Sequence, residues 1–275
     1  KVNDEVKWLG EEYINWSLPE RVSQRGNEYR QVWVAAEKQL AILPWLRFLG
    51  LYVAEGCISH NRYVRITQKE HPLVDEIATT IRELGWRPIL NVTGPKANCT
   101  NITVCSAQLS RWLQTEFYVD GMGYSSYTKR VPPFVKKLAP HLIKEFLDAY
   151  WRGDGTTELK GGRSWTTYSH QLADDIQELI LKTGKVASLR QGFDQRLEIP
   201  YWRVYERLRA SLEIGTKKVQ RIIYEGMIGC VEVPSHIVLV RRHGKVMWCG
   251  NTTTKILGEQ LCRLFFDNHG LSYAA

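Results

Sequence analysis

Residues 48–56, FLGLYVAEG, and residues 147–155, LDAYWRGDG, decide the architecture of this chain. The two stretches align without a gap when the sequence is shifted by 99 residues, from position 48 to position 147. The same shift places Thr67, His71, Leu73, Asp75, Ile77, Ile81 and Gly85 on Thr166, His170, Leu172, Asp174, Ile176, Ile180 and Gly184. Self-similarity at one fixed offset indicates an internal duplication. The sequence therefore predicts two copies of one unit, related by a pseudo-two-fold axis.

Each copy reads as a helix, two strands, a second helix, then further strand and helix. In the first copy the apolar spacing predicts helices over residues 44–54 and 73–84 and strands over 62–68, 88–93 and 100–105. In the second copy it predicts helices over 141–153 and 172–182 and strands over 164–168, 187–191 and 201–205. Gly56 and Gly85 end the two helices of the first copy, and Gly56 suits the left-handed position after a helix. The predicted class is a duplicated α+β fold.

An acidic residue ends the first helix of each copy. Glu55 and Asp154 both stand immediately before a glycine. The C-terminus of a helix carries about half a negative charge, so each carboxylate is repelled by its own helix. A cation would relieve that repulsion.

Small residues recur on one side of the same two helices. Gly50 and Ala54 are four residues apart, as are Ala149 and Gly153, so each pair shares a helix face. If the helices pair along these faces, Glu55 comes close to Asp154, and two like charges favour a divalent metal. The arrangement predicts a site with oxygen ligands, suited to Mg²⁺ or another divalent cation.

The composition indicates nucleic acid or another anionic surface as a partner. The formal net charge of +8 favours an anionic partner. Hydrophobic residues make up 44% of the chain, which suffices for a sizeable core. No apolar run approaches the ~20 residues that span a membrane, and no leader opens the chain. The six cysteines show no zinc-binding spacing, so we expect reduced thiols and a cytoplasmic or nucleoid-associated protein.

Both nine-residue stretches resemble the signature of the LAGLIDADG homing endonucleases in their single-chain form. The resemblance covers about residues 40–210. It implies two αββαββα units whose sheets clasp double-stranded DNA, a monomer, and paired acids that hold metal for phosphodiester hydrolysis. The first stretch ends in Glu rather than Asp, and Asp148 and Arg152 make the second stretch more polar than usual.

The resemblance implies two further site residues. Gln68, at the end of a predicted strand, matches a position that orders water near the metals. Lys129, in the stretch TKRVP at 128–132, matches a lysine that approaches the scissile phosphates, and the alternative is a solvated surface lysine. Gln68 falls on Thr167 at the offset of 99, so we expect unequal active sites and one DNA strand to be cut faster.

DNA binding is expected from polar side chains that project from one sheet face or its edge. Arginine suits guanine edges, and asparagine and glutamine suit adenine. The candidates are Arg62, Arg65, Asn91, Thr93, Arg190, Gln191 and Arg203.

The end of the chain resembles the C-terminal splicing blocks of an intein. Residues 229–240 alternate like a strand and lead through a glycine turn into a second strand. On this resemblance Asn251 would cyclise, Thr252 would be the acceptor nucleophile and His236 would assist. Gly250 stands where inteins usually carry His. No N-terminal splicing half is recognisable in residues 1–40, so we expect that these 275 residues do not complete splicing by themselves.

The predicted organisation has four parts. They are a connector (1–40), an endonuclease domain (41–215, with repeats 41–139 and 140–215), a C-terminal splicing segment (216–251) and the start of a host protein (252–275). Two alternatives remain: a non-cleaving DNA- or RNA-binding module of the same fold, such as a regulator or maturase, and a purely structural duplication.

Overall fold

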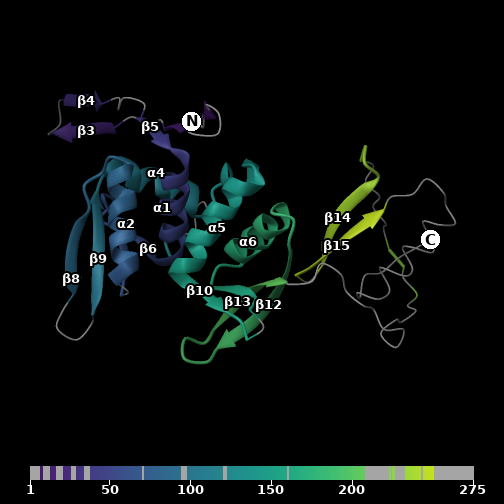
Figure 1. The fold of residues 1–275 in the computed structure, drawn as a ribbon. Coiled ribbons are helices and arrows are strands. Elements are labelled where there is room, and N and C mark those ends of the chain that lie inside the picture. Colours follow the sequence, from purple (N-terminus) through teal and green to yellow (C-terminus); the bar gives the residue numbers. More distant parts are fainter. Residues whose placement is uncertain are drawn as a thin grey trace.

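The computed structural model describes the chain from Lys7 to Gly250, with gaps. The described residues are 7–8, 13–16, 21–25, 29–33, 38–69, 71–93, 98–119, 123–159, 161–207, 223, 225–226, 233–242 and 244–250; side chains are described from residue 38 onward, except Thr93. Figure 1 shows two helix-and-sheet halves side by side and a separate hairpin near the C-terminus.

The two halves repeat one order of elements as far as the fourth strand of each sheet; the last helix of the first half has no counterpart among the described residues of the second. The first contains α1 (Ile42–Glu55), β6 (Gly56–Ser59), β7 (Tyr63–Gln68), α2 (His71–Glu83), β8 (Ile89–Thr93), β9 (Cys99–Cys105) and α4 (Ala107–Phe117). The second contains α5 (Pro140–Asp154), β10 (Gly155–Thr157), β11 (Arg163–Thr167), α6 (His170–Lys182), β12 (Val186–Asp194) and β13 (Ile199–Arg207). A short 3-10 helix, η1 (Val135–Lys137), lies in the connection. The predicted α+β class and its duplication are confirmed.

The two sheets share one topology. Their strand orders are β6-β7-β9-β8 and β10-β11-β13-β12, and all neighbouring strands are antiparallel. Side chains alternate between the faces of a strand, so Val64 and Ile66 of β7 lie with Ile102 and Val104 of β9 in the buried core under the helices. Trp165 of β11 is buried in the same way. The intervening residues form the outer face of each sheet.

Helices α1 and α5 pack against each other along their small residues, as predicted. A Cβ atom on Gly50 would lie 2.5 Å from the carbonyl oxygen of Phe146 and 2.8 Å from Cβ of Ala149. A Cβ atom on Gly153 would lie 2.5 Å from Cβ of Ala54. Only side chains this small allow the two backbones to approach so closely. The C-terminal ends of α1 and α5 therefore adjoin at the junction of the halves.

The glycine after α1 has a different role from the predicted one. Gly56 has a φ of −81°, which is extended, so the expectation of a left-handed conformation is wrong. A Cβ atom on Gly56 would lie 2.2 Å from Cδ2 of Tyr52, and one on Gly155 would lie 2.1 Å from Cδ1 of Trp151. Both glycines are thus required by the aromatic ring of the preceding helical turn. Gly85, where α2 ends, does have a positive φ, of +75°.

Short strands lie outside the two halves. β1 (Lys7–Trp8), β2 (Tyr13–Trp16) and β5 (Lys38–Ala41) form one sheet, and β3 (Arg21–Arg25) pairs with β4 (Tyr29–Trp33). The predicted hairpin near the C-terminus is present as β14 (Ile237–Arg242) and β15 (Lys245–Gly250). β14 begins later than predicted because His236 N–H donates to the carbonyl of Val233 in a turn. None of the described helices is long and apolar enough to cross a bilayer.

Candidate active site

Two carboxylates adjoin where α1 and α5 end. Glu55 is the last residue of α1 and Asp154 is the last residue of α5. Partial burial and the neighbouring charge of Glu55 raise the pKa of Asp154 to about 6. Burial also raises the pKa of Glu55, while the charge of Lys129 acts in the opposite direction. The two acids predicted from the separate repeats therefore form one electrostatic site.

Lys129 is buried beside these acids rather than solvated. Lys129 is only 7% exposed. Its Nζ donates to the carbonyl oxygens of Tyr52 (3.3 Å), Val53 (2.8 Å) and Gly56 (2.9 Å). Burial lowers the pKa of Lys129 to about 8, although the charges of Cys57, Glu55 and Asp154 oppose that shift. An ammonium group has three donors, and here all three are directed at the end of α1. In this arrangement Lys129 supplies charge to the site but directs no N–H toward a phosphate.

The surroundings of the two acids differ, as the offset predicts. Gln68 ends β7, two residues beyond Ile66, which pairs with Gly56 next to Glu55. Its Oε1 accepts from the N–H of Lys69 at 2.7 Å. The equivalent Thr167 is buried, and its Oγ1 accepts from the N–H of Ser169 at 3.1 Å. An amide side chain thus stands near Glu55 and a hydroxyl near Asp154.

The oxygen ligands present in the site fit a divalent cation that is bound by few protein groups. Among the described residues, neither Glu55 nor Asp154 forms a hydrogen bond or an ion pair. No group of three or more His, Cys, Asp or Glu side chains could hold a metal in the described part of the chain. Mg²⁺ commonly uses one or two carboxylates and completes its shell with water and substrate phosphates. Two unpartnered carboxylates with raised pKa values match that preference.

The outer face of the first sheet carries part of the predicted DNA-binding set. Arg65 pairs with Cys57 and Thr103, and its Nε is buried without a hydrogen-bond partner among the described residues. Asn91 lies on the same face because it pairs with Asn101. Arg62 precedes β7 in an exposed turn. Thr93 ends β8, and its side chain lies outside the described residues.

The second sheet carries the rest of the set. Arg190 and Arg203 pair directly across β12 and β13, and each guanidinium lies 5.4 Å from the ring of Tyr205. Nη2 of Arg203 also forms an ion pair with Glu158 at 3.1 Å. Gln191 pairs with Trp202 and lies on the opposite face, since successive residues alternate. Gln191 remains accessible because β12 is an edge strand.

Strand alternation also identifies outer-face residues that the sequence analysis left out. Tyr63 and Thr67 share the face of Arg65, and Tyr201 and Tyr205 share the face of Arg203. Their even spacing from the arginines was the available signal.

The predicted splicing residues lie at the C-terminal hairpin. His236 is exposed, just before β14, and Ile237 pairs with Gly250 at the end of β15. Asn251 and Thr252 lie outside the described residues.

Comparison with known proteins gives a family match for the second half. Residues 141–224 match the family described as "LAGLIDADG-like domain". This range begins in α5, contains Asp154 and continues past β13.

Similar curated proteins are much longer than this chain. The chain is 25% identical to the replicative DNA helicase DnaB of Nostoc sp. over 169 residues, which cover 56% of this chain and 19% of the helicase. It is also 25% identical to the RNA polymerase subunit beta C-terminal section of Stigeoclonium helveticum, covering 80% of this chain and 25% of that protein. The chain thus spans a quarter or less of these two relatives.

A similar solved structure is that of I-DmoI in complex with DNA and Mn. It has 16% sequence identity and a TM-score of 0.44, covering 61% of this chain and 90% of that chain.

Proposed function

We propose that this chain is a site-specific double-strand DNA endonuclease of the LAGLIDADG type, which hydrolyses phosphodiester bonds with a divalent cation. The observation that carries the proposal is the pair of unpartnered carboxylates, Glu55 and Asp154, at adjoining ends of two equivalent helices. The match of residues 141–224 to a LAGLIDADG-like domain supports the same assignment for the second half.

The residues of the site divide the chemistry among them. Glu55 and Asp154 would hold the cation, which would supply Lewis-acid stabilisation of the charge that develops on the phosphate. Lys129 keeps a positive charge beside both carboxylates while it ties down the end of α1. Such fixed charge favours an anionic transition state without any rearrangement at the moment of reaction. Gln68 orients water on the Glu55 side only.

The outer faces of the two sheets bind the DNA. Arg65 and Asn91 project from one sheet, and Arg190 and Arg203 from the other. Guanidinium groups suit both phosphates and guanine edges. The net charge of +8 adds long-range attraction to the duplex. Because both halves belong to one chain, the enzyme acts as a monomer.

We further propose that the endonuclease is embedded in an intein. A helicase and an RNA polymerase subunit have unrelated activities, yet each matches this chain over only 19% or 25% of its length. That pattern fits an insert carried by different hosts. In the hairpin, the Ile237–Gly250 pair brings His236 to the end of the strand that Asn251 follows in the sequence. Asn251 would then cyclise with help from His236, and Thr252 would accept the upstream segment.

The endonuclease is tested with a library of plasmids that carry randomised inserts. The protein is incubated with the library and Mg²⁺, and the cut ends are recovered and sequenced. We expect cuts at one defined sequence by the wild type and by Asp148→Asn, which alters another acid of α5. We expect none by Glu55→Gln or Asp154→Asn. Tight binding without cuts in Mg²⁺ or Mn²⁺ would instead establish a non-cleaving binding module.

A further inference from the structure

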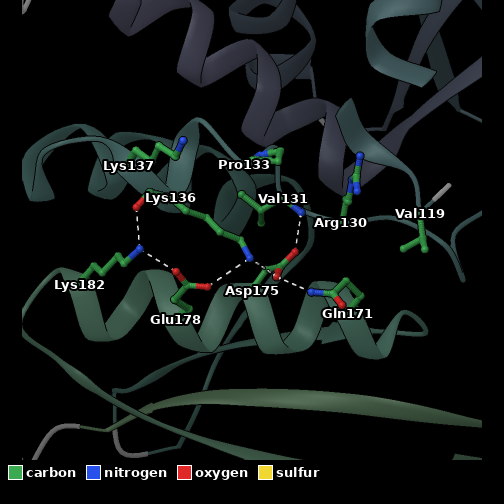
Figure 2. Close-up of a pocket in the computed structure, with 10 residues that line it drawn as sticks. All are labelled: Val119, Arg130, Val131, Pro133, Lys136, Lys137, Gln171, Asp175, Glu178 and Lys182. Carbon is green, nitrogen blue, oxygen red and sulfur yellow. Dashed lines mark hydrogen bonds and ion pairs between the residues drawn. The ribbon is translucent and has the colours of Figure 1, made fainter. Parts of the chain in front are cut away.

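A buried carboxylate holds the connection between the two halves. The side chain of Asp175 on α6 is 2% exposed, and Figure 2 shows three donors converging on it. Oδ2 accepts from the N–H of Val131 at 2.8 Å, and Oδ1 accepts from Nζ of Lys136 at 2.5 Å and Nε2 of Gln171 at 2.8 Å. Burying a carboxylate is costly unless it is fully hydrogen-bonded. Two of its three donors belong to the connection, so the carboxylate ties that segment to α6.

A second residue of α6 holds the same segment. Ser169 caps the helix by accepting from the N–H of Leu172 at 3.2 Å, and its Oγ donates to the carbonyl oxygen of Lys129 at 2.5 Å. The backbone at residues 129 and 131 is therefore anchored on both sides of Arg130.

This anchored segment carries the ammonium group of the candidate site. Lys129 reaches from the connection to the carbonyl oxygens at the end of α1, in the other half of the molecule. Its ammonium stays beside Glu55 only while the backbone at residue 129 is fixed. A displacement near 1 Å would break contacts of 2.8 and 2.9 Å to Val53 and Gly56.

The duplication shows that this contact is specific to one half. At the offset of 99, Asp175 corresponds to Glu76 of α2, whose carboxylate pairs instead with Arg152 of α5. An acid recurs at this helix position, but only the second copy uses it to hold the connection.

We propose that Asp175 is a positioning residue for the candidate active site. Through Val131 it fixes the segment that carries Lys129, and so keeps the ammonium group at the end of α1 beside the two acids. The effect of Asp175 on DNA cleavage rests on the proposed endonuclease function. The contact between Asp175 and Val131 does not depend on that function.

The test compares Asp175→Asn and Asp175→Ala with Glu178→Gln. Alanine removes the acceptor for the N–H of Val131, whereas an asparagine oxygen still accepts from it. Glu178 also pairs with Lys136, at 3.1 Å, but it does not contact the 129–131 segment, so it is a matched control. Reductive methylation by formaldehyde and borohydride, followed by peptide mass spectrometry, measures the accessibility of Lys129 in each folded protein. We expect the reactivity of Lys129 to rise on the order of tenfold in Asp175→Ala, to rise less in Asp175→Asn and to stay near wild type in Glu178→Gln.

DNA cleavage provides the second readout. In Asp175→Ala we expect the single-turnover rate to fall about tenfold, with DNA affinity retained, because only the placement of a charge has changed. If Asp175 acts through Lys129, the double variant with Lys129→Met cuts as slowly as Lys129→Met alone, rather than showing the product of both losses.

The outcomes separate the two proposals. A folded Asp175→Ala protein with unchanged Lys129 reactivity would overturn the positioning role, whether or not the wild type cuts DNA. Raised reactivity in a protein whose wild type never cuts would support the positioning of Lys129 and overturn the nuclease. If Asp175→Ala does not fold, Ser169→Ala replaces it, with Ser106→Ala as control because Ser106 caps α4 in the same way without touching Lys129. Equal Lys129 reactivity in those two variants would also reject the role.

Discussion

The carboxyl group of Asp154 is destabilised as an anion in the metal-free protein. Its pKa is about 6 in the folded chain against a usual value of 3.8, so the folded state binds a proton more tightly between these values. The free energy of unfolding therefore falls as the pH rises from about 4 to about 6, and the loss persists above that range. Asp154→Asn removes the loss. Because the side chain is partly exposed and screened, we expect the metal-free variant to gain about 1 kcal/mol at pH 8 and nothing at pH 4, measured by urea unfolding.

Asp148 on the same helix supplies a control of opposite sign. Hydrogen bonds from Lys144 and Arg163 lower its pKa despite partial burial, so Asp148→Asn should destabilise the protein at pH 8. Added Mg²⁺ should stabilise the wild type and Asp148→Asn but hardly affect Asp154→Asn. A metal-free Asp154→Asn protein that is less stable than wild type at pH 8 would contradict the electrostatic account.

Single residues differ in how far the sequence predicts them. Glu55 and Asp154 were identifiable because a carboxylate at a helix C-terminus is unfavourable without a partner. Lys129 was identifiable only by resemblance. Its three hydrogen bonds at the end of α1 join residues at least 73 positions apart, which no local sequence pattern predicts. The face of Gln191 could not be assigned from the sequence: it pairs with Trp202, and a shift of one residue in a strand exchanges its faces.

At the scale of elements, the close packing of α1 on α5 sets the distance between the acids. Gly50→Val would place a side chain 2.5 Å from the carbonyl of Phe146, so the helices must separate. We expect a loss of about 1–3 kcal/mol in the free energy of unfolding and weaker Mg²⁺ binding, because the carboxylates move apart. Thermal unfolding and calorimetric titration with Mg²⁺ measure the two effects.

Leu43 provides the comparison for that substitution. It lies on the same helix and is 41% exposed, so Leu43→Val should leave both Mg²⁺ affinity and helix spacing close to wild type. Unchanged Mg²⁺ affinity in a folded Gly50→Val protein would show that helix spacing does not govern the metal site.

The sequence predicts helices and strands well where apolar residues recur at a regular period. It predicts them poorly where a steric contact sets the backbone conformation. The helices and the paired strands of both halves occur close to their predicted ranges, because each buries one regular face. The conformation of Gly56 was not predictable from helix-ending rules, since the constraint comes from the ring of Tyr52 rather than from φ. The late start of β14 follows from a turn whose hydrogen bond joins His236 to Val233.

For the whole molecule, two sheets with arginines on their outer faces should grip one duplex together. Arg65→Ala and Arg190→Ala each remove one cation, from different halves. We expect either change to reduce the slope of log affinity against log salt by up to about one unit, measured by fluorescence anisotropy with the target duplex. Each should also shorten the footprint on one side only. Arg82→Ala, on the exposed surface of α2, should alter neither the slope nor the footprint.

The unequal surroundings of the two acids predict unequal cutting of the two strands. Gln68 is half-buried at the end of β7, whereas the equivalent Thr167 is buried and accepts a backbone hydrogen bond. An amide N–H can orient water for attack, whereas a buried hydroxyl is withdrawn from that water, so we expect about a tenfold difference in strand rates. A supercoiled target plasmid should then pass through a nicked form. On a linear target duplex with a different end label on each strand, the first cut should always fall in the same strand. Gln68→Thr should slow the preferred strand toward the rate of the other, so that less of the nicked form accumulates and its nicks are divided equally between the strands. The slower strand serves as the internal reference. Equal wild-type rates on both strands would mean that the difference between these side chains has no catalytic consequence.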